Sequence, residues 1–186
     1  MKIGIFGGSF NPPHDMHKRI ATDLIKKNYL DKVVYVPTGD WYEKEELIAA
    51  KDRYNMVCLM IEDDADLVVS DYEIKNKISC TYQTLDYFNN LYSNDEIYFI
   101  CGSDNLRNIN TWDNYQYILD NYKVLVIRRD NDQIIDYKNV IATDILMSNL
   151  SSTQIREELR LNYCDCKICD RVLKYIKENN LYTSYD

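Results

Sequence analysis

The chain has 186 residues, enough for one domain with a substantial core and few for two. Its formal net charge is −8 and no block of Lys and Arg stands out, so the composition argues against a nucleic-acid partner. The N-terminus has no long apolar signal region and no run of about eighteen apolar residues, so we expect no signal peptide, no membrane span and a cytoplasmic location.

The N-terminal segment combines a strand, a glycine pair and a helix start. The apolar run Ile3–Phe6 predicts a buried strand, and Gly7 and Gly8 after it let the backbone turn tightly and expose its N–H groups. The pattern becomes helical from Asp15, which is a suitable N-cap. This arrangement favours an anion such as phosphate through oriented N–H groups and the helix dipole.

Both histidines of the chain, His14 and His17, fall in this segment, and helical spacing would place them on one face. They add hydrogen-bond donors without a fixed negative charge. The alternative is a pair of metal ligands, but no third ligand follows at a recognisable spacing and the H-E-x-x-H pattern is absent. The Walker A and G-x-G-x-x-G patterns are absent too, so a P-loop ATPase and a dehydrogenase have no support.

Strands and helices alternate along the rest of the chain. We expect strands at 33–36, 67–69, 96–101 and 122–127 and a weaker strand near 140–141. We expect helices at 15–29, 47–61, 81–91 (capped by Thr81), 112–119, 153–161 and 170–179, and a short one around Leu106. Residues 73–79 are polar and ambiguous. The alternation predicts an α/β fold, a Rossmann-like doubly wound parallel sheet. We expect one domain over 1–186, with the C-terminal helical part, about 151–186, packed on it.

Two further polar clusters follow predicted elements. Gly102-Ser103-Asp104 comes directly after the strand 96–101, and binding crevices of parallel sheets form at the carboxyl ends of strands. Near the C-terminus, Ser151-Ser152-Thr153 precedes a helix, and Arg156 follows one turn later. The hydroxyls can cap free N–H groups and the guanidinium can reach the same anion, although an ordinary cap with a solvated arginine is the alternative.

The two end segments resemble the signature motifs of the nucleotidylyltransferase superfamily. Residues 8–17 match G-[ST]-F-[DN]-P-x-H-x-x-H, and residues 151–156 match the S-S-T-x-[IV]-R element with which this superfamily grips the ATP phosphates. Its members join a nucleoside monophosphate to a second phosphate with loss of pyrophosphate.

Three more matches resemble the nicotinate/nicotinamide mononucleotide adenylyltransferases within that superfamily. Gly102-x-Asp104 followed by Trp112 is similar to their G-x-D…W element, in which the aspartate meets a ribose and the tryptophan stacks on the nicotinic ring. Residues 81–85 resemble the T-x-x-T-L helix start that lines the same pocket, and residues 172–182 resemble the closing helix V-x-x-Y-I-x-x-x-x-L-Y. The resemblance covers nearly the whole chain.

The resemblance implies an enzyme of NAD biosynthesis that transfers AMP from ATP to nicotinate mononucleotide, forming deamido-NAD and pyrophosphate. Mg²⁺ would enter with ATP. The residues implied for catalysis are His14, His17, Lys44 and Arg156. Those implied for ATP binding are Gly7, Gly8, Ser9, Phe10, Gly102, Asp104, Ser151, Ser152 and Thr153. Those implied for mononucleotide binding are Thr81, Thr84 and Trp112.

The loop after the second strand departs from the family pattern. Nicotinate-specific members usually carry P-P-H-K there, whereas residues 41–44 read Trp-Tyr-Glu-Lys. With Asp40 and Leu47 the loop is similar to that of members that accept nicotinamide mononucleotide, and Asn11 and Met16 lean the same way. Nicotinamide mononucleotide is therefore the alternative substrate. A catalytically silent nucleotide-binding sensor is the other alternative, which the intact His, Lys and Arg residues argue against.

Six cysteines in a chain of this size fit reduced thiols better than a disulfide framework. Cys164, Cys166 and Cys169 are spaced closely enough to be zinc ligands, but no fourth ligand is obvious, and a loop of reduced thiols is the alternative. We therefore expect no dedicated metal site. The sequence leaves the oligomeric state open, a homo-oligomer included.

Overall fold

The computed structural model describes residues 1–41, 46–129, 137–147, 150–161 and 167–183 of the chain. Its centre is a six-stranded parallel sheet with the strand order β3-β2-β1-β4-β5-β6. The strands are β1 (Lys2–Gly8), β2 (Lys32–Pro37), β3 (Leu67–Val69), β4 (Glu96–Gly102), β5 (Lys123–Arg128) and β6 (Val140–Leu146). The order reverses between β1 and β4, and a crevice forms at such a point outside the carboxyl ends of the strands.

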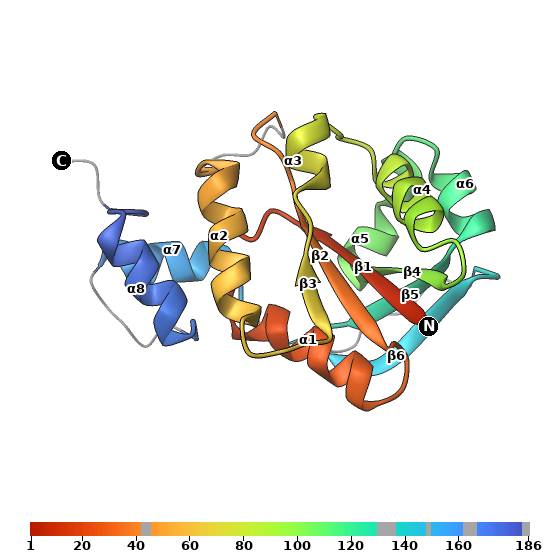
Figure 1. Cartoon of the computed structure of the whole chain (residues 1–186), viewed down its shortest axis with the longest axis horizontal. Coiled ribbons are helices and arrows are strands. Elements are labelled where there is room, and N and C mark those ends of the chain that lie inside the picture. Colours follow the sequence, from red (N-terminus) through yellow and green to blue (C-terminus); the bar gives the residue numbers. More distant parts are fainter. Residues whose placement is uncertain (42–45, 130–136, 148–149, 162–166, 184–186) are drawn as a thin grey trace.

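Helices connect the strands from β1 to β5 and cover the sheet (Figure 1). They are α1 (Asp15–Lys26), α2 (Ala50–Ile61), α3 (Tyr72–Asn76), α4 (Thr81–Leu91), α5 (Ser103–Arg107), the 3₁₀ turn η1 (Ile109–Thr111), α6 (Tyr115–Asn121), α7 (Ser152–Arg160) and α8 (Asp170–Glu178). The predicted α/β class with a doubly wound parallel sheet is confirmed, because helices alternate with strands from β1 to β5 and every strand pair is parallel.

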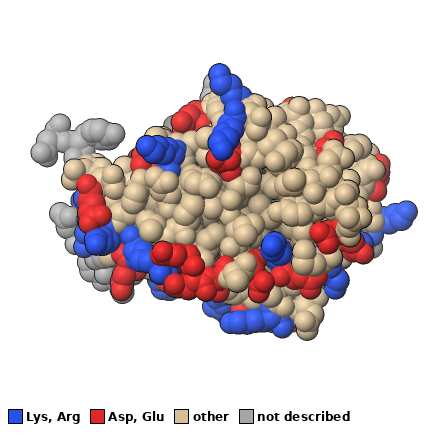
Figure 2. Space-filling model, in the orientation of Figure 1, with Lys and Arg blue, Asp and Glu red and all other residues tan. Residues whose placement is uncertain are grey.

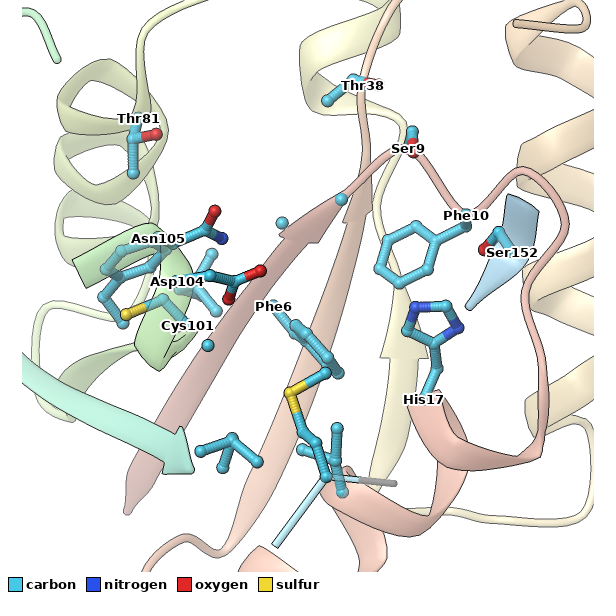
Figure 3. Close-up of a pocket in the computed structure, with 18 of the residues that line it drawn as sticks. Phe6, Ser9, Phe10, His17, Thr38, Thr81, Cys101, Asp104, Asn105 and Ser152 are labelled. Carbon is cyan, nitrogen blue, oxygen red and sulfur yellow. The ribbon is translucent and has the colours of Figure 1, made fainter. Parts of the chain in front are cut away.

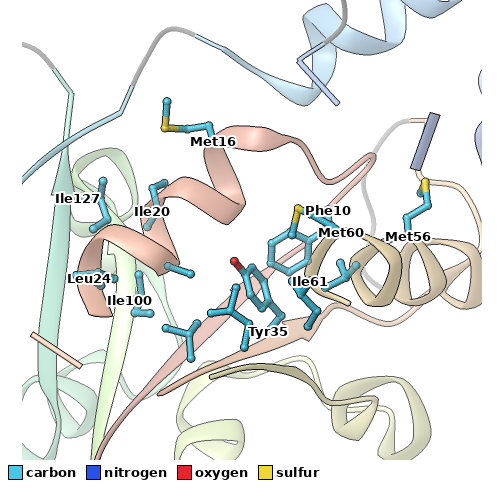
Figure 4. Packing of buried hydrophobic residues seen from close by; sticks show 14 of the residues in the cluster. Phe10, Met16, Ile20, Leu24, Tyr35, Met56, Met60, Ile61, Ile100 and Ile127 are labelled. Atoms are coloured by element: carbon cyan, nitrogen blue, oxygen red, sulfur yellow. The ribbon is translucent and has the colours of Figure 1, made fainter. Parts of the chain in front are cut away.

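The inner strands β2, β4 and β5 are buried on both faces, which explains why they read as continuous apolar runs, whereas the edge strand β6 alternates between buried and exposed residues. On one face Ile20 and Leu24 of α1 pack against Ile100 of β4 and Ile127 of β5 (Figure 4). On the other face lies a second cluster of strand residues and residues of α4 and α6, among them Val34, Val36, Phe99, Leu85, Phe88 and Ile118.

The C-terminal helix α8 packs against α2 (Figure 1). Ile155 of α7 and Val172 and Ile176 of α8 are buried in the same cluster as α1 and α2. The hydroxyl of Tyr175 donates to Asp52 Oδ1 at 2.8 Å. This packing fixes the start of α7 near the carboxyl end of β1.

The turn after β1 differs from the expected one. Gly7 and Gly8 stay in the strand, because they are paired with Val36 and Pro37 of β2, and the left-handed backbone occurs at Phe10 (φ 46°). The expected turn at the glycine pair is therefore wrong. A Cβ on Gly7 would have no heavy atom within 4 Å, so this glycine leaves open space at the strand end, whereas a Cβ on Gly8 would lie 3.1 Å from the Phe10 ring.

Two helix caps also differ from the expected ones. His14 is the N-cap of α1 and Asp15 its first residue, because the N–H of His14 finds an acceptor in the side chain of His17, at 3.2 Å from Nδ1. The N–H of Asp15 donates to the carbonyl of Lys167 at 2.9 Å. Cys80 rather than Thr81 is the N-cap of α4. The ambiguous stretch 73–79 begins inside the short helix α3.

Charged side chains of both signs are interspersed on the face shown in Figure 2, and Lys and Arg are not gathered in one patch there. The longest described helices, α1 and α2, have 12 residues each. Among the described residues no helix is both long and apolar enough to cross a membrane.

Candidate active site

A cleft of about 750 Å³ opens where the strand order reverses, at the carboxyl ends of β1 and β4. The starts of α1, α4, α5 and α7 and the residue after η1 form its walls. In Figure 3, His17, Phe10 and Ser152 lie on one side of the β1 end, and Thr81, Asn105 and Asp104 lie on the other. We call these sides the α7 side and the α4 side.

The two histidines lie together on the α7 side. Their rings are stacked with centroids 3.8 Å apart. His17 Nδ1 accepts the N–H of His14 at 3.2 Å, so a neutral His17 carries its ring hydrogen on Nε2. The hydroxyl of Tyr35 donates to the carbonyl of His17 at 2.9 Å and anchors this first turn of α1. His17 can therefore present an N–H donor to a ligand.

His14 is only 4% exposed, and its Nδ1 has no hydrogen-bond partner among the described residues. Burial lowers the pKa of His14 to about 4, because the charged imidazolium would lose its hydration. The ring is therefore neutral at pH 7, and His14 contributes to the wall of the cleft.

The two ends of the chain meet at the α7 side. Ser152 Oγ donates to the carbonyl of Pro12 at 3.0 Å, and Arg156 Nη1 donates to the carbonyl of Asn11 at 3.0 Å. Ser151 caps α7, since its Oγ accepts the N–H of Gln154 at 3.2 Å. Two helix N-termini, those of α1 and α7, thus face one cleft, and their N–H groups and dipoles favour an anion.

Arg156 is 5% exposed and already binds anionic oxygen. Its Nε donates to Glu46 Oε2 at 3.1 Å, and Glu46 also pairs with Arg160 at 2.5 Å. Hydrogen bonds from Arg160 and then Arg156 lower the pKa of the Glu46 carboxyl. The guanidinium fork that holds a carboxylate can equally hold a phosphate.

Arg53 supports this side of the cleft from inside the protein. Its side chain is fully buried, and its guanidinium donates to the carbonyls of Ser9 at 2.9 Å, Thr38 at 2.7 Å and Ile48 at 2.9 Å. It therefore ties the segment after β1 to the segment after β2. The signal in the sequence is an arginine on the apolar face of a predicted helix, beside Met56.

The α4 side combines aromatic and hydroxyl groups with an acid. Trp112 lies edge to face with Phe99, with ring centroids 6.0 Å apart. Glu73 is 9% exposed and lines the cleft, and its Oε1 accepts the hydroxyl of Thr84 at 2.7 Å. Burial raises the pKa of Glu73 to about 7, and the hydrogen bond from Thr84 works against this rise.

Asp104, at the start of α5, pairs with Arg129 at 3.5 Å across the end of β5. Among the described residues no group of three or more His, Cys, Asp or Glu side chains could hold a metal ion. The described cysteines, Cys58, Cys80, Cys101 and Cys169, are free. Cys164 and Cys166, which their spacing in the sequence made candidate zinc ligands, lie outside the described residues.

The structure brings the predicted site residues that it describes to the wall of this one cleft, while their roles stay predictions. They are Gly7, Gly8, Ser9, Phe10, His14, His17, Thr81, Thr84, Gly102, Asp104, Trp112, Ser151, Ser152, Thr153 and Arg156. Lys44 lies outside the described residues. Glu73, Thr38 and Arg129 also line the cleft and were missed. Glu73 stands in the polar stretch that the sequence leaves ambiguous, and no local pattern marks an acid as buried. Asn11, in contrast, is fully buried and does not line the cleft.

Comparisons with known proteins agree on one family. Residues 5–158 match the family model described as cytidylyltransferase-like. A Clostridium acetobutylicum protein named "Probable nicotinate-nucleotide adenylyltransferase" is 36% identical, over 97% of this chain and 98% of its own length. A Caldicellulosiruptor saccharolyticus protein of the same name is 34% identical, over 98% of this chain and 99% of its own length.

Solved structures share the fold. The Plasmodium falciparum nicotinic acid mononucleotide adenylyltransferase complexed with NaAD has a TM-score of 0.82 at 24% identity, covering 97% of each chain. The same Plasmodium enzyme complexed with APC has a TM-score of 0.79 at 23% identity, covering 97% of this chain and 96% of that one.

Proposed function

This chain belongs to the cytidylyltransferase-like family and, within it, to the nicotinate-nucleotide adenylyltransferases, and from that membership we propose that it transfers AMP from ATP to nicotinate mononucleotide. The products are deamido-NAD, an intermediate of NAD biosynthesis, and pyrophosphate. One observation supports the proposal above the others: residues 11–17 and 151–156 lie side by side at the switch point of the sheet, with two helix N-termini directed at one cleft.

The reaction is an in-line displacement at phosphorus. An oxygen of the mononucleotide 5′-phosphate forms a bond to the α-phosphorus of ATP, the bond from that phosphorus to the α,β-bridging oxygen breaks, and pyrophosphate leaves with the electron pair. Chemistry of this kind needs positioning and charge neutralisation more than a nucleophilic side chain. The groups of the α7 side supply both.

His17 donates from Nε2 to the phosphate oxygens where charge develops, and His14 supports it as a neutral ring, since its pKa is about 4. Backbone N–H groups after β1 and at the start of α7 bind the remaining oxygens. Arg156 and Lys44 hold the β- and γ-phosphates. For this, Arg156 exchanges the Glu46 carboxylate, which it contacts at 3.1 Å, for a phosphate.

Mg²⁺ is proposed to arrive on the triphosphate. The described residues offer no cluster of acids or histidines that would hold a resident ion, whereas Mg²⁺ characteristically keeps several waters and binds substrate phosphates. When bound, it neutralises charge on the β- and γ-phosphates. The described cysteines are free, which suits a reducing compartment, and we therefore place the reaction in the cytoplasm.

The mononucleotide is proposed to bind on the α4 side, with its ring against Trp112 and with Thr81 and Thr84 beside it. Asp104, also on the α4 side, is proposed to meet a ribose of ATP. Nicotinamide mononucleotide is the alternative substrate, because residues 40–47 depart from the nicotinate-specific pattern.

A pyrophosphate-release assay with ATP and Mg²⁺ tests the proposal, using each mononucleotide in turn and ATP alone as the control. We expect release with nicotinate mononucleotide and none with ATP alone. Faster release with the nicotinamide compound would establish the alternative substrate. ATP binding without release from either mononucleotide would establish a silent sensor and refute the enzyme.

A further inference from the structure

The two sides of the cleft differ in charge. The α7 side carries the buried Arg156 and two helix N-termini. The α4 side carries Thr81, Thr84, Trp112 and the buried acid Glu73, and Thr81 lies across the β1 end from His17 and Ser152 (Figure 3). If the triphosphate occupies the α7 side, as the proposed function requires, the pyridine ring of the other nucleotide lies on the α4 side.

Glu73 and Thr84 form a closed pair at this side. Thr84 is 2% exposed, and its hydroxyl gives its single O–H to Glu73 Oε1 at 2.7 Å. A hydroxyl has one donor and two acceptor positions. When Glu73 is ionised, the Thr84 oxygen can therefore only accept a further hydrogen bond, and a negative charge stands behind it.

The two candidate substrates differ only in the substituent of the pyridine ring, and this is the group that the Glu73–Thr84 pair would contact. Nicotinate carries a carboxylate, which accepts hydrogen bonds and is repelled by an ionised carboxyl. Nicotinamide carries a carboxamide, whose N–H groups can donate to it. We propose that Glu73, acting through the Thr84 hydroxyl, sets the preference of this cleft between the carboxylate and the carboxamide form of the mononucleotide. This inference rests on the proposed function.

The proton on Glu73 decides which form is favoured. A protonated Glu73 donates to Thr84, which frees the Thr84 hydroxyl to donate to a carboxylate. An ionised Glu73 leaves only acceptors and selects the carboxamide. Because burial places the pKa of Glu73 near 7, both states are populated around neutral pH.

Several titratable groups surround Glu73. Among the described residues of the α4 side, none of them is a buried cation. On its own helix, Lys75 is paired with Asp71 at 2.7 Å and lies 71% exposed. The other titratable groups on its helix and on α4 are Tyr72, Tyr82, Tyr87 and Asp86, whose carboxylate accepts the hydroxyl of Tyr117 at 2.9 Å. Cys80, the N-cap of α4, donates to Asp113 at 3.2 Å. β2, which also packs on α3, contributes Val36 and Pro37 at its end. A carboxylate bound here finds no compensating charge from these groups.

The test is the ratio of kcat/KM for nicotinate mononucleotide to that for nicotinamide mononucleotide, measured from about pH 6 to about pH 8. Both substrates carry the same phosphate, so its titration cancels in the ratio. We expect the wild-type ratio to fall about tenfold over this range. We expect Glu73→Gln, which keeps the shape and removes the charge, to raise the ratio about tenfold at the upper end and to abolish its pH dependence.

Two further variants separate this role from a structural one. Thr84→Ser keeps the hydroxyl and should retain the pH dependence, whereas Thr84→Val should lose it. Glu178→Gln, at an exposed ion pair with Lys174 on α8, is the matched control and should leave the ratio unchanged. If Glu73→Gln does not fold, as judged by its melting curve, the wild-type pH profile and the comparison of Thr84→Ser with Thr84→Val still test the inference.

A wild-type ratio that stays constant with pH, or a folded and active Glu73→Gln enzyme with the wild-type ratio, would overturn the inference and leave the proposed function standing. Wild-type protein that releases pyrophosphate with neither mononucleotide would overturn both.

Discussion

The α7 side and the α4 side of the cleft are built in different ways. The α7 side consists of two helix starts, residues 14–17 and 151–156, in which the contributing side chains are close neighbours in sequence. The α4 side joins Glu73, Thr84 and Trp112 from three separate elements. A phosphate-binding helix start is a local structure, so a short motif can encode it. A ring-binding wall depends on tertiary packing and leaves a weaker trace in the sequence.

The two sides also differ in the part of the reaction that they contact. Donors on the α7 side meet phosphates on which charge shifts during the reaction, so changes there should lower kcat. Groups on the α4 side hold a ring that does not react, so changes there should raise the KM of one substrate.

His17→Ala tests this contrast with the largest expected effect. Removing the Nε2–H donor should lower kcat about 10²- to 10³-fold, because the contact strengthens as charge moves to the bridging oxygen. ATP affinity should stay within about tenfold of wild type, since a contact made in the transition state affects rate before affinity. Steady-state kinetics and calorimetric titration with ATP measure the two quantities. Near-normal turnover in this variant would contradict the role of His17.

His14 links the α7 side to the stability of the protein. Its pKa is depressed from 6.5 to about 4, so its contribution to stability is complete above pH 6.5 and is lost as the pH falls toward 4. The unfolded chain takes up the proton first over this range. We expect a loss of about 3 kcal/mol in the free energy of unfolding.

Urea unfolding of the wild type and of His14→Asn at several pH values measures this loss. The variant lacks the titrating group but keeps a polar side chain, so the difference between the two proteins isolates His14 from the carboxylates. Parallel stability curves for the two proteins between pH 6.5 and pH 4 would show that the His14 pKa is not depressed.

Trp112→Ala probes the α4 side. Loss of the ring should raise the KM for the mononucleotide about tenfold, because stacking of a base on an aromatic side chain contributes about 1–3 kcal/mol. The KM for ATP and kcat should change less than about threefold. Trp112→Phe is the control. Its KM for the mononucleotide should lie between those of the wild type and Trp112→Ala, because it keeps a ring beside Phe99. An equal rise in both KM values would mean that the two sides are not separate.

Glu46→Gln should have the smallest effect of these variants, and it should improve ATP binding rather than impair the enzyme. The Glu46 carboxylate is 43% exposed and occupies the Arg156 guanidinium that the triphosphate is proposed to bind. Weakening this partly exposed pair should lower the KM for ATP about threefold. Glu62→Gln, which removes a carboxylate paired with Arg171 at 3.2 Å, should leave the KM for ATP unchanged. A higher KM in Glu46→Gln would mean that the pair positions Arg156 rather than competing for it.

The sheet could be predicted because buried parallel strands are apolar over their whole length, as in 33–36 and 67–69. The motifs at residues 8–17 and 151–156 could be assigned to one site because each helix start is encoded by a short run of neighbouring residues. The glycine turn was wrong because hydrogen bonds to β2 hold Gly7 and Gly8 in the strand, a tertiary effect. Asp15 was wrong as a cap because His17 supplies the acceptor for the preceding residue. Glu73 was missed because burial of an acid depends on the helices around it.

The most direct test of the central claim is a crystal structure of the protein with a non-cleavable ATP analogue. The claim is that residues 14–17 and 151–156 hold one triphosphate between them. We expect phosphate oxygens within about 3.2 Å of the His17 ring and, in the same molecule, of Ser152 or Arg156, with Glu46 displaced from Arg156. A triphosphate that touches only one of these segments, or that binds outside the cleft, would contradict the claim.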